Sequence, residues 1–458
     1  MTLIDHAILG ASLLAVLLVG LWAGRGVTKL EHFSVAGREF GAWVVFATLS
    51  ASFIGGGFTM GNAEKVFLVG IVNIFALWGF SLKEVLVATV IAPRMQRFPD
   101  AISVGGIMGQ AYGKPGRMVT GVFGVMLCAG IMGAQVGAMG YVFNLFLGLD
   151  YLVGILIGCS IAIAYSTVGG MRAVVFTDIL QFLILGVGIP LTLFLGLDLA
   201  GGWRAVADKV PADHLTLLGE MGPWAFISLF LTFLLGETLV PPYVQRLMIG
   251  RSAGHTARGT LWSGLFSVPF FAISGAIGLV ALTMAPDLDP NLALPYLVQQ
   301  ALPVGLRGLV VAGIIAVVMS SADSFLNGAA VCLTSDVVLP AMRNPLSERG
   351  QLRLAKGANL ITGILAIVFA ISIKSVLGIL LYAYNFWAPV ILPPLVAAFF
   401  GTRAGAGVFL AAAAAGLGGT VLWNVGLGAP GGVDGLIIGV GCNALVFWLG
   451  KFLSRAPA

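Results

Sequence analysis

The chain has 458 residues, of which 59% are hydrophobic and only 9% are charged, and its mean hydropathy is +1.03. Soluble domains carry about 25% charged residues, so this composition excludes an ordinary soluble globular protein. Apolar runs of roughly 20 residues, long enough to cross a bilayer, recur along the whole chain. We count about thirteen such runs joined by mostly short links, and expect one all-α polytopic membrane domain.

The formal net charge of +5 reflects how basic residues are distributed between the two ends of the predicted helices. When the runs are threaded in order, most Lys and Arg residues, Arg246 among them, fall on one side. The positive-inside rule makes that side cytoplasmic and places the N-terminus outside and the C-terminus inside. The basic excess is therefore explained by topology in a plasma membrane rather than by nucleic-acid binding. The sequence has no Asn-x-Ser/Thr acceptor, which favours a bacterial source.

The second apolar run contains the most unusual stretch of the chain. The first run, about residues 4–23, lacks a basic leader and is expected to be a permanent extra helix within residues 1–30. The second, about residues 40–69, has four glycines in the seven residues from Gly55 to Gly61. Glycine costs about 1 kcal/mol relative to alanine inside a helix, so we expect a broken helix here. Such a break faces protein or a wet cavity, where loose carbonyls and a helix N-terminus suit a cation and a polar solute.

The third run ends near residue 92 and carries Lys83 and Glu84 in its middle. Adjacent residues do not face each other on a helix, so we expect the two side chains not to pair directly. Because charge at the centre of a bilayer is unfavourable, both are expected to point into the bundle or a wet crevice.

The middle of the chain continues the alternation of helix and short link. Helices are expected at about 118–147 and 151–166, followed by a cytoplasmic glycine turn at Gly169-Gly170 and a helix with Asp178 in its first turns. The longest link, about 198–222, is expected outside.

A second interruption lies in the run at about 223–248, where glycine and paired prolines occur between Gly236 and Pro242. A short external helix is expected at 292–301, and a long helix at about 306–339. The last four helices are expected at about 357–373, 376–400, 404–424 and 433–453.

The two interrupted helices, the second and the seventh, lie five helices apart and cross in opposite directions in this topology. That arrangement predicts an inverted repeat of helices 2–6 against helices 7–11, with the binding site at its centre. The repeat core is expected over residues 38–400, and residues 401–458 are expected to form additional C-terminal helices.

The ninth helix carries oxygen ligands suited to a hard cation. Ser320, Ser321, Asp323 and Ser324 place three hydroxyls and a carboxylate within five residues. A carboxylate buried in a membrane calls for a cation or a proton. The alternative for the serines is hydrogen bonding to carbonyls of their own helix.

Four motifs together resemble those of the sodium:solute symporter family. They are Phe33–Arg38, the glycine break, Thr167–Gly170 with Phe176–Gln181, and Val317–Ser324. The resemblance covers roughly residues 30–400 and is locally greatest to sodium-coupled choline transporters. It implies a leucine-transporter-like inverted repeat and sodium-coupled transport.

The resemblance also implies positions for sodium. The main site would use the carbonyls of Ala51, Ile54 and Val317 and the hydroxyls of Ser320 and Ser321. A possible second cation site would use Asp178, Asp323 and Ser324. The alternative is that Asp178 caps its helix and Asp323 pairs with an arginine.

The solute is less well defined. At three positions where the choline transporters have tryptophan, this chain has Phe53, Val240 and Ile131, which argues against choline. Glu237 is an intramembrane carboxylate and favours a solute that bears an ammonium group. The candidate solute contacts are Ser52, Phe53, Gly56, Thr59, Gln135, Glu237, Thr238, Tyr384 and Asn385, with Trp387 as a further gate candidate.

The sequence thus predicts a sodium-coupled secondary active symporter that imports a small organic solute by alternating access. Sodium is the coupling ion, no other cofactor is expected, and the partners are the solute, sodium and the bilayer, without nucleic acid. The histidines lie in predicted links without metal or nucleophile spacing, so an enzyme is not expected. A channel and a transporter-fold sensor without net transport remain the alternatives.

Overall fold

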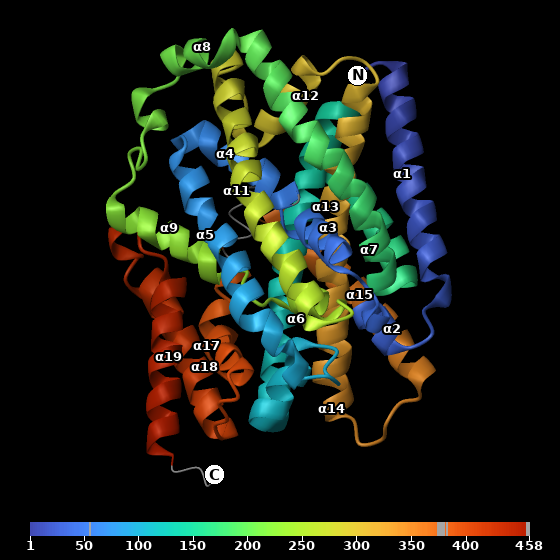
Figure 1. The fold of residues 1–458 in the computed structure, drawn as a ribbon, viewed down its shortest axis with the longest axis vertical. Coiled ribbons are helices and arrows are strands. Elements are labelled where there is room, and N and C mark those ends of the chain that lie inside the picture. The colour runs from blue at the N-terminus through green and yellow to red at the C-terminus, as the bar shows by residue number, and fades with distance from the viewer. Residues whose placement is uncertain (55, 373–380, 382, 455–458) are drawn as a thin grey trace.

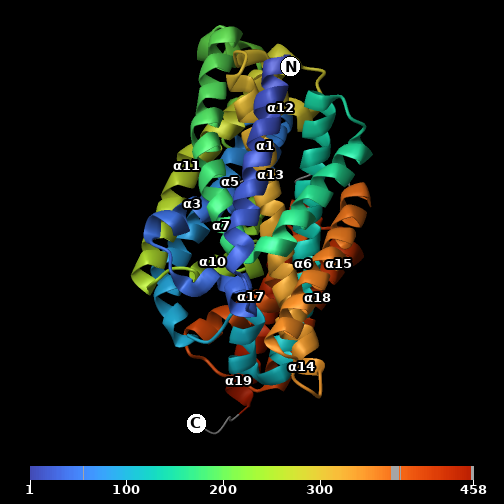
Figure 2. The same ribbon diagram turned by 90° about the vertical axis from the view of Figure 1, so that its right-hand side faces the viewer.

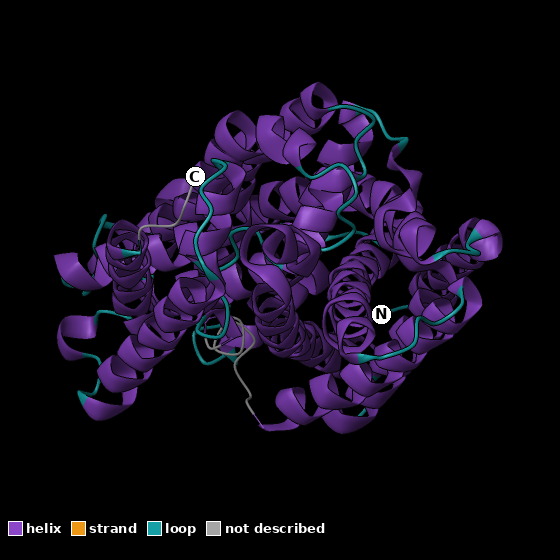
Figure 3. Cartoon of the chain, turned by 90° about the horizontal axis from the view of Figure 1, so that it is seen from below, coloured by secondary structure: helices purple, strands orange, loops and turns teal. Residues whose placement is uncertain are grey.

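Helices make up almost all of the computed structural model, which describes residues 1–54, 56–372, 381 and 383–454 (Figure 1). Viewed from below, the described chain shows helices and loops, and no strand is drawn (Figure 3). This arrangement confirms the all-α prediction. The helices in chain order are α1 Leu3–Ala23, α2 Leu30–Val35, α3 Ala42–Phe53, α4 Gly56–Val69, α5 Val72–Leu86, α6 Val104–Leu147, α7 Tyr151–Ala200, α8 Gly202–Lys209, α9 Pro223–Leu235, α10 Pro241–Met248, α11 Ala253–Met284, α12 Ala293–Ala301, α13 Leu306–Val331, α14 Leu339–Ala341, α15 Glu348–Ser372, α17 Ala388–Phe399, α18 Ala406–Val421 and α19 Gly435–Leu453.

Within the described residues, nine helices are long and apolar enough to cross a membrane, or ten if the bent pair α3–α4 is one span. Three shorter apolar helices, Tyr151–Ala164 within α7, α9 and α17, lie where further runs are expected. The total of about thirteen spans remains a prediction.

Both expected interruptions are present. Helix α3 ends at Phe53, α4 begins at Gly56, and the two segments are bent by 47°. Gly55 itself lies outside the described residues. Helix α9 ends at Leu235 before Gly236, and α10 begins at Pro241, since proline is favoured at the first position of a helix, where its missing N–H would have no partner.

Of two expected boundaries, one was wrong and one was confirmed. The helix expected to begin near residue 118 begins at Val104 and contains a non-helical glycine, Gly113, before Pro115. The two helices expected on either side of Gly169-Gly170 are present as two segments of α7, and the non-helical backbone at Gly170, with φ 54° and ψ −157°, confirms the expected glycine turn between them. Glycine adopts this backbone geometry without a side-chain clash, so the chain changes direction there without a separate loop.

Helix α13 forms the centre of the bundle. In its most apolar stretch 94% of the residues are buried, against 22% for α1 and 22% for α19. It packs against α1, α3, α6, α7 and α15, and lies among them in both side views (Figure 2). The hydroxyl-rich turn of α13 is therefore held in the interior, where polar groups need partners.

The two ends of the bundle carry different elements. The N-terminus, α8 and α12 lie at one end, and the C-terminus and α14 lie at the other (Figure 1). Helix α12 confirms the short helix expected at 292–301.

Candidate functional site

The break between α3 and α4 meets the serine-rich turn of α13. The hydroxyl of Ser321 donates a hydrogen bond to the carbonyl oxygen of Ser52 at 2.8 Å. The Ser52 hydroxyl lies 3.3 Å from that of Ser320 and 3.2 Å from that of Ser324. All four serines are buried, so the last turn of α3 and α13 share one polar contact within an otherwise apolar bundle.

The backbone side of the predicted sodium site lies next to this contact. Ala51, Ile54 and Val317 line a cavity of about 10 Å³ together with apolar residues of α7 and α11. Ile54 follows the last residue of α3, and its carbonyl accepts a hydrogen bond of 2.6 Å from the Thr59 hydroxyl. A carbonyl has two lone pairs, so this bond leaves one for an ion. Three of the five residues predicted to bind sodium thus line a single small space.

Asp178 is the charged centre of the same region. It is fully buried on α7 and accepts hydrogen bonds from the hydroxyls of Thr48, Ser52 and Ser320. It lies within the helix rather than at its first residue, so the alternative that it caps a helix is wrong. Buried carboxylates require such donors because transfer out of water is otherwise unfavourable.

Arg246 is the residue that sequence reasoning missed. We counted it among the basic residues of the cytoplasmic side, but on α10 it is fully buried and forms an ion pair of 3.1 Å with Asp178. Its Nη2 also lies 2.5 Å from the hydroxyl of Ser324. A signal was present, since an arginine four positions after the second of the paired prolines, Pro242, lies at membrane depth rather than in a link.

The predicted second cation site is therefore partly assembled. Asp178 and Ser324 are brought together by the guanidinium of Arg246. Asp323 is buried on the same helix as Ser324, with its Oδ1 3.4 Å from the Ser324 hydroxyl.

A second buried charge cluster also lies close to Phe53. Lys83 and Glu84 form an ion pair of 2.7 Å, and their side chains are 1% and 0% exposed. The prediction that both point inward is confirmed, but the prediction that they do not pair was wrong. The backbone places them side by side, and a long flexible lysine reaches its neighbour once the bundle excludes other partners. The hydroxyl of Tyr243, on α10, donates to Glu84 at 3.1 Å.

Aromatic rings surround the Lys83 ammonium. Its Nζ lies 3.7 Å from the ring centre of Phe80, 4.3 Å from that of Tyr243 and 5.8 Å from that of Phe53. Such positions over ring faces stabilise a cation. An internal ammonium thus occupies the aromatic surface next to the α3–α4 break.

Several of the predicted solute contacts gather around the α9–α10 break. Glu237 is 2% exposed, and its Oε2 has no hydrogen-bond partner among the described residues. Tyr384 packs on the backbone at Gly236, where an added Cβ would lie 2.4 Å from its ring. The indole of Trp387 donates to the carbonyl of Thr238 at 3.0 Å.

For three other residues predicted to contact the solute, the structure shows mainly their position. Asn385 is half-buried and donates to the carbonyl of Leu381 at 3.4 Å. Gln135 is buried on α6. Gly56 is the first residue of α4, which places its backbone at the break.

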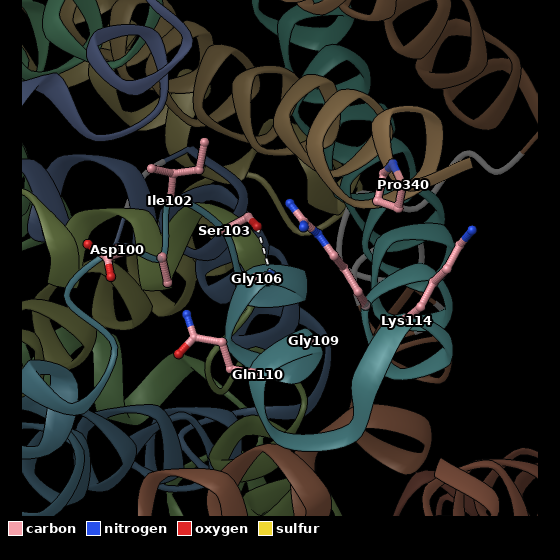
Figure 4. Close-up of a pocket in the computed structure, with 10 residues that line it drawn as sticks. Asp100, Ile102, Ser103, Gly106, Gly109, Gln110, Lys114 and Pro340 are labelled. Atoms are coloured by element: carbon pink, nitrogen blue, oxygen red, sulfur yellow. Dashed lines mark hydrogen bonds between the residues drawn. The ribbon is translucent and has the colours of Figure 1, made fainter. Parts of the chain in front are cut away.

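A larger cavity of about 510 Å³ lies at the end of the bundle that carries α14 (Figure 4). Ser103, Gln110 and Lys114 are among its lining residues, and its described lining includes none of the predicted site residues. Behind it, Ser103 donates to Asp336 at 2.7 Å.

The fold and these buried polar breaks define a membrane transporter built from discontinuous helices. A family model for the sodium:solute symporter family matches residues 33–416. The chain belongs to this family, as the motifs predicted, and is a transport protein rather than an enzyme.

Two curated relatives illustrate the range of the family. The chain is 26% identical over 398 residues to high-affinity choline transporter 1 of Drosophila melanogaster, covering 80% of this chain and 62% of that protein. It is 24% identical over 461 residues to the high-affinity proline transporter PutP of Bacillus subtilis, covering 96% of each.

Among solved structures, a Na⁺-coupled sialic acid symporter in a substrate-bound outward-open state is similar over 100% of this chain and 99% of its own. The TM-score is 0.86 at 20% sequence identity. This similarity establishes the shared fold.

Proposed function

We propose that this chain is a sodium-coupled secondary active symporter that imports a small organic solute by alternating access. The observation that carries the proposal is the contact between Ser321 on α13 and the carbonyl of Ser52 at the end of α3. Family membership supports the same activity.

Sodium binds, in this proposal, between the α3 break and α13. Its ligands are the carbonyls of Ala51, Ile54 and Val317 and the hydroxyls of Ser320 and Ser321. The ion draws the two helices together, stabilises the outward-open state and shapes the solute site. Coupling requires that sodium bind this state more tightly than the inward-open one, because equal affinity would shift no population.

The available driving force is sufficient for accumulation. One inward sodium ion gains about 2.3 kcal/mol per 100 mV, and a tenfold gradient adds about 1.4 kcal/mol. Together they support a gradient of roughly several hundredfold for a neutral solute.

The solute in this proposal bears an amine that contacts Glu237. Lys83 and Glu84 neutralise each other at 2.7 Å, and Glu237 lies within electrostatic range of both. This cluster therefore has one carboxylate in excess, which favours a cationic group. The Lys83 ammonium already occupies ring faces of Phe80 and Tyr243. An amine with N–H groups for Glu237 is thus favoured over a quaternary ammonium.

The proposal also includes the arrangement of the helices in the membrane. Residues 38–400 form the transport core as an inverted repeat, preceded by a helix within residues 1–30 and followed by helices within residues 401–458. The N-terminus is outside and the C-terminus in the cytoplasm of what is proposed to be a bacterial cell. The ends of the bundle fit this orientation, since the two termini lie at opposite ends.

The test is a thermal-shift screen of purified protein with and without sodium, across amines, amino acids, sugars and carboxylates. Sodium alone is expected to raise the melting temperature, and Ser320→Ala with Ser321→Ala should remove that rise. The exposed Ser372→Ala is the matched control and should retain it. A melting temperature indifferent to sodium in the unmutated protein would contradict the proposal.

Transport itself is measured in proteoliposomes with the solute that the screen selects. Saturable uptake that requires a sodium gradient is expected. Flux that grows linearly with solute would indicate a channel, and binding without uptake would indicate a sensor.

A further inference from the structure

The guanidinium of Arg246 lies where the second cation is predicted to bind. Taking the proposed sodium coupling as its basis, we infer that this guanidinium is the permanent cation of the second site and replaces a second sodium ion. Its Nη2 lies 3.1 Å from the carboxylate of Asp178 and 2.5 Å from the hydroxyl of Ser324. These are two of the three residues predicted to bind that cation.

Each nitrogen of the guanidinium has an oxygen partner. Nη2 also donates to the Ser52 hydroxyl at 2.5 Å, Nε to the Thr48 hydroxyl at 3.1 Å, and Nη1 to the carbonyl of Pro242 at 3.3 Å. Hydroxyls, a carboxylate and a carbonyl are also the ligands of a hard cation. Arg246 therefore uses the coordination that a sodium ion would need.

The charge balance leads to the same conclusion. Asp178 and Arg246 are both 0% exposed, and within the described part of the chain the ion pair formed by this carboxylate is the one with the guanidinium. A guanidinium remains protonated at any working pH, and its side chain is covalently attached to α10. A sodium ion at Asp178 would have to displace it and would be repelled at short range.

The arrangement links the second site to the first through Ser320. The hydroxyl of Ser320 donates to Asp178, so its lone pairs remain available for sodium at the main site. Arg246 holds Asp178, Asp178 orients Ser320, and Ser320 binds the coupling ion. The consequence is a transporter that couples each solute to a single sodium ion.

The experiment counts bound sodium on the purified full chain with radioactive sodium in a scintillation proximity assay. One ion per chain is expected, and Ser321→Ala should remove it. A count of two in the unmutated protein would overturn the inference and leave sodium coupling intact. A count of zero would instead overturn the proposed function itself.

Variants of the arginine test its role directly. Arg246→Ala vacates the site and should raise the count from one to two, whereas Arg246→Lys retains a tethered cation and should keep the count at one. A count of one in Arg246→Ala would mean that the arginine is only structural, which overturns the inference. If Arg246→Ala does not fold, the pair Asp178→Asn with Arg246→Gln removes both charges together. This pair is expected to bind one ion, and two would contradict the assignment.

Discussion

At the scale of single residues, two buried cations lie close to one aromatic ring. The Nζ of Lys83 lies 5.8 Å and the Cζ of Arg246 5.5 Å from the ring centre of Phe53. Each cation has a carboxylate of its own, Glu84 and Asp178. Phe53, the last residue of α3, therefore adjoins both the cluster proposed to bind solute and the cluster proposed to bind cations.

Glu237→Gln is expected to weaken binding of the amine-bearing solute. The substitution removes a charge-assisted hydrogen bond of about 1.5–3 kcal/mol, which corresponds to roughly a tenfold to hundredfold rise in Kd. The Kd is measured by titrating the purified variant with the solute in the presence of sodium. The exposed Glu31→Gln is the control and should bind like the unmutated protein. Unchanged affinity in Glu237→Gln would refute the amine contact.

Lys83→Met is expected to destabilise the fold by about 3–5 kcal/mol, because it leaves Glu84 buried without its cation. Adding Glu84→Gln should recover most of the loss. Unfolding in denaturant measures both variants. The control is Lys29→Met, which breaks an ion pair whose side chains are 54% and 67% exposed and is expected to change stability by less than about 1 kcal/mol. Equal losses of stability in Lys83→Met and Lys29→Met would contradict the view that Lys83 neutralises the buried Glu84.

At the scale of elements, interruptions rather than helices position the site. The break after α3 places Ile54 in the lining of the small cavity, and the break after α9 lies next to Tyr384 and Trp387. The kink of α7 at Gly170 sets the direction of the segment that carries Asp178. Each interruption occurs at glycine or proline, whose backbone properties act locally.

Gly170→Ala is expected to destabilise the protein by about 2 kcal/mol or more, because its backbone geometry is strained for any residue with a Cβ. The added Cβ would also lie 2.6 Å from the ring of Phe33. Gly186→Ala, on the same helix, has no atom within 4 Å of its Cβ and is the matched control. Thermal unfolding compares the two variants. A loss in Gly186→Ala as large as that in Gly170→Ala would show that the kink is not the cause.

At the scale of the whole molecule, the bundle is organised around α13, and the peripheral α1 is fastened to its beginning. The buried Asp5 of α1 accepts hydrogen bonds from the backbone N–H of Gly305 at 2.8 Å and of Gly308 at 3.2 Å. Arg307 adds an ion pair of 3.3 Å. A single carboxylate thus connects the first helix to the central one.

Asp5→Ala is expected to reduce stability by about 3 kcal/mol, because two backbone donors and an arginine lose a charged acceptor. The exposed Asp208→Ala should have almost no effect. Denaturant unfolding of both variants in the same detergent gives the comparison. Equal stability of the two variants would show that α1 is held by apolar packing alone.

The features that could be predicted from the sequence are those that depend on residues close together in the chain. The apolar runs predicted the helices, and glycine and proline predicted the breaks near Gly55 and Gly236, because backbone preference depends on nearby residues. The turn at Gly170 was also predicted correctly, whereas the boundary near residue 118 was misplaced because the helical segment before Gly113 was not expected. In the site, the hydroxyls of Ser320 and Ser321 were expected to face the α3 break, and Ser321 does contact the carbonyl of Ser52.

The sequence by itself therefore determined the membrane class, the family and the position of the interruptions, since hydropathy and backbone propensity are encoded over a few consecutive residues. Only the tertiary structure decided which charges pair. Arg246 and Asp178 are 68 positions apart, and Lys83 turns to its own neighbour Glu84. In a bundle interior each charge takes whichever partner packing leaves within reach, and that choice is not encoded in spacing along the chain.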